Sequence, residues 1–202
     1  MGRGDSTREA LIDAAATLID ERGIEGVSVR EVARMAGVSS GAPFRHFADK
    51  NALMSAVAMQ ALERFNATLD AAAAQHEGNP LEAFRAMGIA YVKLAVANPP
   101  HFRAMHRVEY TGPEAPEPVR RAIQHMQERM LEYIKLAQAA GMMRPDDPAI
   151  ILMGAHAIVY GLARMFVDGQ MAAQGIGPEQ AEPITHAMTD LIGRGFAPVA
   201  DA

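Results

Sequence analysis

The stretch from residue 28 to residue 50 constrains the fold more than any other part of this sequence. Ser28 and Glu31 have the spacing of a capping box, which marks the start of a helix. Gly37 lies where glycine commonly ends a helix. Between them, apolar residues follow the i, i+3, i+4, i+7 spacing of one helix face: Val29, Val32, Ala33 and Ala36. The pattern predicts a short helix that stops at a tight turn.

A second helix is predicted after this turn. Ser39 or Ser40 can cap it, and Phe44 and Phe47 are expected to anchor it in a core. Two helices joined by a short turn that contains glycine are typical of a helix-turn-helix, whose second helix enters the major groove of DNA. Spacing alone leaves an alternative open, which is an ordinary helical hairpin with a solvated polar face.

The polar residues of this stretch are candidate DNA contacts. Backbone N–H groups at the start of the second helix favour phosphate oxygens. Arg45 is long enough to bond a guanine edge in bidentate fashion, and His46 and Lys50 can lie against the DNA backbone. The predicted DNA-contacting residues are Ser28, Ser39, Ser40, Gly41, Ala42, Phe44, Arg45, His46 and Lys50.

Residues 7–60 resemble the N-terminal domain of the tetracycline-repressor (TetR) family of bacterial transcription regulators. The matching residues are 7–9, 11–23, 26–33, 36–39, Gly41, 45–47, Asp49, Lys50 and Leu53. The resemblance implies a dimeric, all-helical regulator, more often a repressor than an activator, that binds a near-palindromic operator. The family usually has Leu-Tyr where this chain has Pro43-Phe44. Phe44 lacks the hydroxyl with which that Tyr commonly contacts a phosphate.

The charge distribution agrees with a protein that touches DNA at one end. The chain has a formal net charge of −5, but residues 28–50 hold four cationic and two acidic side chains, so this stretch carries +2 and the rest −7. The absence of Cys excludes disulfides, thiolate metal sites and a Cys nucleophile. No apolar segment follows the polar residues 1–9, so no signal peptide is expected and a cytoplasmic location is.

The remaining sequence predicts helices only. Residues 1–5 are expected to be disordered, although Arg3 and Arg8 can reach DNA as an N-terminal arm does. The connector helix is expected to start at an Asp49 cap, and Asn98-Pro99-Pro100 is expected to stop the helix before it. The predicted helices are 6–22, 49–76, 80–97, 101–108, 118–140, 148–167 and 178–196, with a loop at 109–118. We predict a DNA-binding domain over residues 1–52 and a ligand-binding and dimerisation domain over 53–202.

Residues 148–167 are the most apolar stretch and are about long enough to cross a bilayer. His156 and Arg164 interrupt the stretch and acidic residues flank it, so it is expected to be a soluble-protein helix buried on every side. Together with residues 178–196 it is predicted to form a dimer interface. The run from His156 to Gly169 also resembles a C-terminal subgroup of the TetR family.

A cavity for an apolar effector is predicted in the C-terminal part. Methionine is frequent there and suits adaptable surfaces, although these residues can equally fill a helical core. His125 is a further polar candidate for the interior. The predicted ligand-contacting residues are Met87, Tyr91, Phe102, Met126, Met130, Tyr133, His156 and Tyr160.

No cofactor, metal site or catalytic constellation is predicted. His106 and Glu109 have a spacing that can seat a metal, but such a pair is more often a solvated contact. Three functions stay open at this stage: a ligand-released DNA-binding repressor, a constitutive DNA-binding dimer, and a helical metal-dependent enzyme.

Overall fold

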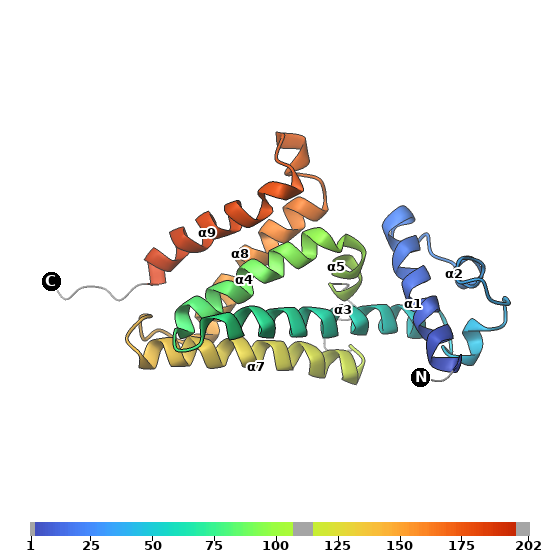
Figure 1. The fold of residues 1–202 in the computed structure, drawn as a ribbon, viewed down its shortest axis with the longest axis horizontal. Helices are drawn as coiled ribbons and strands as arrows, with labels where there is room; N and C mark the ends of the chain where they lie inside the picture. The colour runs from blue at the N-terminus through green and yellow to red at the C-terminus, as the bar shows by residue number, and fades with distance from the viewer. Residues whose placement is uncertain (1–2, 107–114, 197–202) are drawn as a thin grey trace. The chain divides into compact units, whose positions relative to one another are not determined.

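The computed structural model describes residues 3–106 and 115–196, and all regular structure in those ranges is helical. The predicted all-α fold is therefore confirmed. Figure 1 shows the helices in chain order: α1 (Arg3–Arg22), α2 (Val29–Met35), α3 (Lys50–Ala73), α4 (Pro80–Ala97), α5 (Pro99–Met105), α7 (Glu117–Ala139), α8 (Pro148–Val167) and α9 (Ala181–Phe196). Short 3-10 turns lie at Pro43–Arg45, Ala74–His76, Ala172–Gln174 and Pro178–Gln180.

Most helix boundaries agree with the sequence pattern, and the exceptions lie near helix starts. α1 begins at Arg3, so the expectation that residues 3–5 are disordered is wrong for their backbone. Pro99 and Pro100 follow the end of α4 and also begin α5, because the first turn of a helix needs no backbone N–H. The predicted cap of α3 is confirmed, since the Ala52 N–H donates to Asp49 Oδ1 at 2.8 Å. The predicted loop 109–118 and the end of the predicted helix 101–108 lie mostly outside the described residues.

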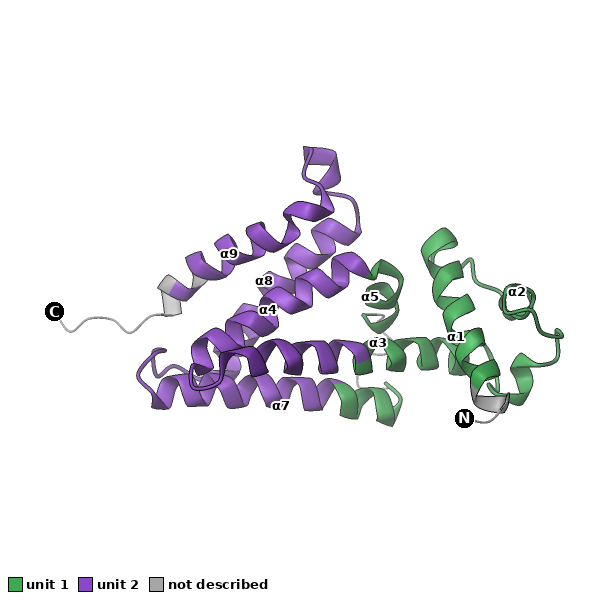
Figure 2. Ribbon diagram, in the orientation of Figure 1, with its two compact units in different colours: residues 1–63, 98–122 green, residues 64–97, 123–202 purple. Residues whose placement is uncertain are grey.

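The helices form two compact units, shown in Figure 2. Unit 1 comprises residues 1–63 and 98–122, and unit 2 comprises residues 64–97 and 123–202. α3 is one uninterrupted helix, so its first part belongs to unit 1 and its remainder to unit 2. The functional boundary predicted near residue 52 is a different division of the chain and stays a prediction.

Unit 1 is built around α1, which packs against α2 and α5. Its core contains Leu11, Leu18 and Ile19 from α1, Val32 from α2, and Phe102 from α5, all fully buried. Polar bonds join the same helices at the surface: the Gln60 side chain bonds Asp13 at 3.3 Å and His101 at 3.1 Å. The predicted three-helix core therefore includes α5 as a fourth member.

Unit 2 packs α4 against α8 and α9, and α8 against α9. α3 and α7 lie side by side (Figure 1), and Arg129 on α7 pairs with Asp70 on α3 at 3.3 Å. α8 is, within the described residues, the helix long and apolar enough to cross a membrane by length and composition. The prediction that α8 is buried on every side is wrong for this chain alone, because Ile150 and Met153 are 59% and 61% exposed.

Candidate functional site

The start of α2 is fixed by Ser28. The Ser28 Oγ accepts the Glu31 N–H at 3.2 Å, and its hydroxyl donates to Glu31 Oε2 at 2.8 Å. The Glu31 carboxylate also pairs with Arg22 of α1. The Ser28 hydroxyl and the Arg22 guanidinium hold the pKa of Glu31 below its usual value. The predicted N-cap is confirmed, and the same contacts tie α2 to α1.

The turn after α2 is closed by Gly37, which has φ +68°. The Val38 N–H donates to the Ala33 carbonyl at 3.0 Å, and the Gly37 N–H donates to the Arg34 carbonyl at 3.2 Å. These two bonds form a Schellman motif, whose left-handed residue is usually glycine. The helix end predicted from Gly37 is therefore confirmed.

Replacing Gly37 by Ala should destabilise the protein by about 1 kcal/mol, because an L-residue is strained in the left-handed region. A Cβ at Gly37 meets no atom within 4 Å, so the expected loss comes from backbone strain alone. Gly41 is a matched control, since its Cβ site is equally open and its φ is not positive. Urea denaturation measures both variants. An equal effect of Gly37→Ala and Gly41→Ala would contradict the strain argument.

The second helix of the predicted helix-turn-helix is a 3-10 turn, so the prediction of an α-helix from Ser39 or Ser40 to Phe47 is wrong. The Ala42 N–H donates to the Ser39 carbonyl at 2.9 Å and the Arg45 N–H to the Ala42 carbonyl at 3.1 Å. Both bonds span three residues, as in a 3-10 helix. Pro43 has no N–H with which to make an α-helical bond to the Ser39 carbonyl, which accounts for the tighter winding.

The two phenylalanines of this segment have different environments. Phe47 is buried, and the Arg8 guanidinium lies over its ring, 5.4 Å from the ring centroid. Phe44 is 57% exposed, so the prediction that it anchors the core is wrong. On an α-helix the two rings would share one face. Here regular structure ends at Arg45, and only Phe47 turns inward.

The predicted DNA-contacting side chains are accessible to different degrees. Arg45 is exposed, and His46 and Lys50 are half-buried. The Lys50 ammonium donates to the Glu25 carbonyl at 3.3 Å and thereby ties α3 to the loop between α1 and α2. The exposed members of the set are Ser28, Ser39, Ser40, Gly41, Phe44 and Arg45; Ala42 is half-buried. The turn thus presents one exposed cation beside an exposed aromatic ring.

Unit 2 contains a cavity of about 500 Å³. Four of the eight predicted ligand-contacting residues line it: Met87, Tyr91, Met130 and His156. The other lining residues are Leu69, Leu81, Glu82, Phe84, Arg85, Gly88, Met143, Leu152, Ala155, Val159, Thr189, Asp190 and Gly193. The positions 81, 84, 85 and 88 on α4 have i, i+3, i+4, i+7 spacing, which is a signal that the sequence analysis missed.

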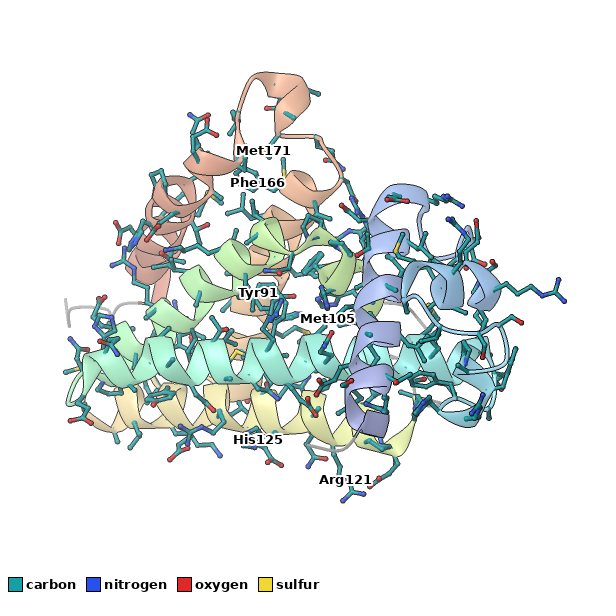
Figure 3. All side chains as sticks on the ribbon, turned by 45° about the vertical axis from the view of Figure 1, so that its right-hand side comes forward. Tyr91, Met105, Arg121, His125, Phe166 and Met171 are labelled. Carbon is teal, nitrogen blue, oxygen red and sulfur yellow. The ribbon has the colours of Figure 1, made fainter. Side chains whose placement is uncertain are left out.

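The other four predicted residues do not line this cavity. Phe102 belongs to the core of unit 1, and Met126 is buried on α7. Tyr133 lies on α7 with the Arg129 guanidinium 5.8 Å from its ring centroid. Tyr160 is stacked on His156, with ring centroids 5.9 Å apart. His125 is exposed and points away from the helices beside α7 (Figure 3).

An aromatic cluster forms the inner wall of the cavity. Tyr91, labelled in Figure 3, is 2% exposed and meets Phe65 of α3 edge-on at 5.4 Å and His156 of α8 at 5.8 Å. Burial raises the pKa of Tyr91, and the nearby Tyr160 raises it further. Burial lowers the pKa of His156. Both groups are therefore neutral at pH 7.

Arg85 joins α4 to α9 beside the cavity. Its Nε donates to Thr189 Oγ1 at 3.1 Å and its Nη2 to the His186 carbonyl at 3.3 Å. It also forms ion pairs with Glu82 and Asp190. The guanidinium is therefore engaged by two carboxylates and two neutral oxygens.

Within the described residues, no group of three His, Cys, Asp or Glu side chains is placed to hold a metal ion. The candidate metal pair is only partly covered, since Glu109 lies outside the described residues. His106 ends α5, with its ring 4.5 Å from that of Phe102.

A helix-turn-helix followed by a helical unit with its own cavity is the architecture of a one-chain transcription regulator. The sequence comparison agrees over both parts. Residues 11–57 match the family described as bacterial regulatory proteins, tetR family, and residues 84–192 match the tetracyclin repressor-like C-terminal domain. The chain belongs to the TetR family of transcription regulators and is not an enzyme.

Similar proteins span nearly the whole chain. The HTH-type transcriptional regulator BetI of Burkholderia thailandensis is 26% identical, covering 95% of this chain and 96% of that protein. A solved structure of a protein with unknown function from Rhodococcus sp. RHA1 is 30% identical, with TM-score 0.80, 95% of this chain and 96% of that one. The TetR family transcriptional regulator PfmR from Thermus thermophilus is 24% identical, with TM-score 0.76, 95% of this chain and 98% of that one.

Proposed function

We propose that this chain is a cytoplasmic, homodimeric repressor that leaves its palindromic operator when an apolar small molecule enters the cavity of unit 2. The observation that carries the ligand-regulated function is the cavity of about 500 Å³ in the same chain as the helix-turn-helix. Ligand sites usually have about 300–1,000 Å³. A constitutive dimer without an effector would be favoured by a filled interior, and this cavity weighs against it.

DNA recognition in this proposal uses the turn after α2. Arg45 contacts a base edge, and the backbone around Ser39 to Gly41 contacts phosphates. The Tyr contact expected from the family is absent, and the exposed Phe44 ring offers an apolar contact to a thymine methyl instead. Lys50 acts as a phosphate contact while it also holds the Glu25 carbonyl.

Dimerisation in this proposal uses α8 and α9. Ile150 and Met153 on α8, and Met188 and Leu191 on α9, are exposed apolar side chains in a soluble type of fold. They are four of the eight exposed large apolar residues in the described ranges. Covering them with a second copy removes apolar surface from water, which is the usual driving force of such association.

Ligand response in this proposal passes through α3. Leu69 near the end of α3 lines the cavity, while Leu53 and Val57 near its start are buried. A ligand changes operator affinity only if it binds one arrangement of the dimer better than another, and the coupling is typically about 1–3 kcal/mol.

Filling the cavity tests the ligand half of the proposal. Ala155→Phe adds a ring to a lining residue, so the variant should bind operator DNA as the wild type does but should no longer be released by inducing compounds. Ala139→Phe adds the same ring to an exposed position on α7 and is the matched control. Fluorescence anisotropy of labelled operator measures release. Normal release from Ala155→Phe would show that the effector binds elsewhere.

A further inference from the structure

The charged side chains of the cavity face solvent. The side chains of Glu82 and Asp190 are 40% and 51% exposed, and that of Arg85 is 24% exposed. The inner wall is dry by comparison, since Met87 and Tyr91 are 1% and 2% exposed. Charge therefore lies at the mouth of the cavity and not inside it.

The one cation that lines the cavity is already neutralised. Arg85 pairs with both carboxylates at the mouth and donates to two further oxygens on α9. A carboxylate on a ligand would have to displace Asp190 to reach it. An ammonium would find Glu82 and Asp190 paired with Arg85 and partly hydrated, where ion pairs contribute little.

The inner polar groups are separate from this mouth cluster. Tyr91 follows Arg85 by six residues on α4, which is about 9 Å along a helix axis. Tyr91 and His156 are in ring contact there, and burial disfavours the charged form of each. A neutral imidazole and a phenol each contain an N–H or O–H donor and an acceptor. Between the two polar regions the walls are apolar: Leu69, Phe84, Met87, Met130, Met143 and Leu152.

We propose that the cavity selects an uncharged, largely apolar ligand that carries one hydrogen-bonding group, such as a hydroxyl or a carbonyl, directed at His156 and Tyr91. This inference rests on the proposed ligand-regulated function. A charged end group would lose its hydration against the inner wall without an opposite charge to replace it. A neutral hydroxyl or carbonyl exchanges bonds to water for bonds to the imidazole or the phenol, and its apolar body covers the methionine and leucine walls.

Matched probes of two shapes test this selectivity. The straight-chain set is 1-octanol, octanoate and octylamine, and the bicyclic set is 2-naphthylethanol, 2-naphthylacetate and 2-naphthylethylamine. Calorimetric titration of the full-length wild type at pH 7 should show the alcohol binding at least about tenfold more tightly than the carboxylate and the amine in one or both sets. The Ala155→Phe variant should bind none of them.

His156 variants test the direction of the polar group. His156→Leu should weaken the bound alcohol about three- to tenfold, the usual effect of one lost hydrogen bond. Its affinity for naphthalene, which has no polar group, should not fall. His125→Leu makes the same substitution on an exposed residue of α7 and should change neither affinity. An unchanged alcohol affinity in His156→Leu would overturn the proposed orientation.

The outcomes separate this inference from the proposed function. If the carboxylate or the amine binds as tightly as the alcohol and Ala155→Phe abolishes that binding, the cavity is a ligand site but the inference of an uncharged ligand is wrong. If no probe binds the wild type, both the ligand class and the effector role of the cavity are contradicted.

Discussion

Replacing Leu191 by Asp should convert the protein from a dimer into monomers and weaken operator binding by about a hundredfold or more, because two linked reading heads gain at least that factor over one. Leu191 is 65% exposed on α9, and Met188 lies three residues before it on the same helix. A carboxylate at this position would have to be desolvated in the dimer without a partner. Sedimentation velocity at micromolar concentration measures the assembly, and a mobility shift measures DNA binding.

Leu136→Asp is the matched control for this prediction. Leu136 is 49% exposed in the same unit but lies on α7, away from α8 and α9. It should leave both the sedimentation coefficient and the operator affinity unchanged. A wild type that sediments as a monomer, or a Leu191→Asp variant that stays dimeric, would remove α9 from the interface.

Arg45→Ala should weaken binding to the specific operator by about 1–3 kcal/mol, which is roughly five- to 150-fold, if Arg45 bonds a guanine edge. Binding to random DNA should fall much less, because base contacts carry the specificity and phosphate contacts do not. Arg45 is exposed in the turn after α2, and no described contact holds it in the protein. Titration of operator and scrambled duplexes at several salt concentrations separates the two effects.

Two further substitutions calibrate the Arg45 result. Lys50→Ala should weaken operator and random DNA alike and reduce the salt slope by about one unit, as the loss of a phosphate contact does. Arg121→Ala removes an exposed cation on α7 that pairs with Glu117 (Figure 3), and it should change neither affinity. Equal losses on both duplexes for Arg45→Ala would make Arg45 a phosphate contact.

The sequence predicted helices well wherever a cap and a regular apolar period agree. The Asp49 side chain caps α3, Gly37 closes α2 with a positive φ, and Pro148 to Val167 form one helix, all as expected. In each case the decisive interaction is local, within about five residues, so the sequence contains it.

The second helix of the helix-turn-helix was mispredicted because one local effect outweighed the pattern. The missing N–H of Pro43 was expected to be tolerated in a first helical turn, but the whole segment is only a 3-10 turn. With so few residues, one absent donor leaves too few α-helical bonds to offset the ordering cost. The placement of Phe44 failed for the same reason.

The cavity could be predicted only in part, because its lining depends on which helices meet. Met87, Tyr91, Met130 and His156 are large residues on inward faces, and they were found. Phe102 is equally large and buried, but α5 packs in unit 1. Arg85 was missed because its role depends on α9, about one hundred residues later, where Thr189 and Asp190 meet it.

The most direct test of the dimeric regulator is to select DNA with the purified full-length protein from fragments of the genome that encodes it, and then to footprint the enriched sequence. A two-fold dimer with one reading head on each copy should enrich an inverted repeat whose half-site centres lie about 34–36 Å apart, or a multiple of that. Both half-sites should be protected together. Enrichment of no sequence, or protection of a single half-site without symmetry, would contradict the account.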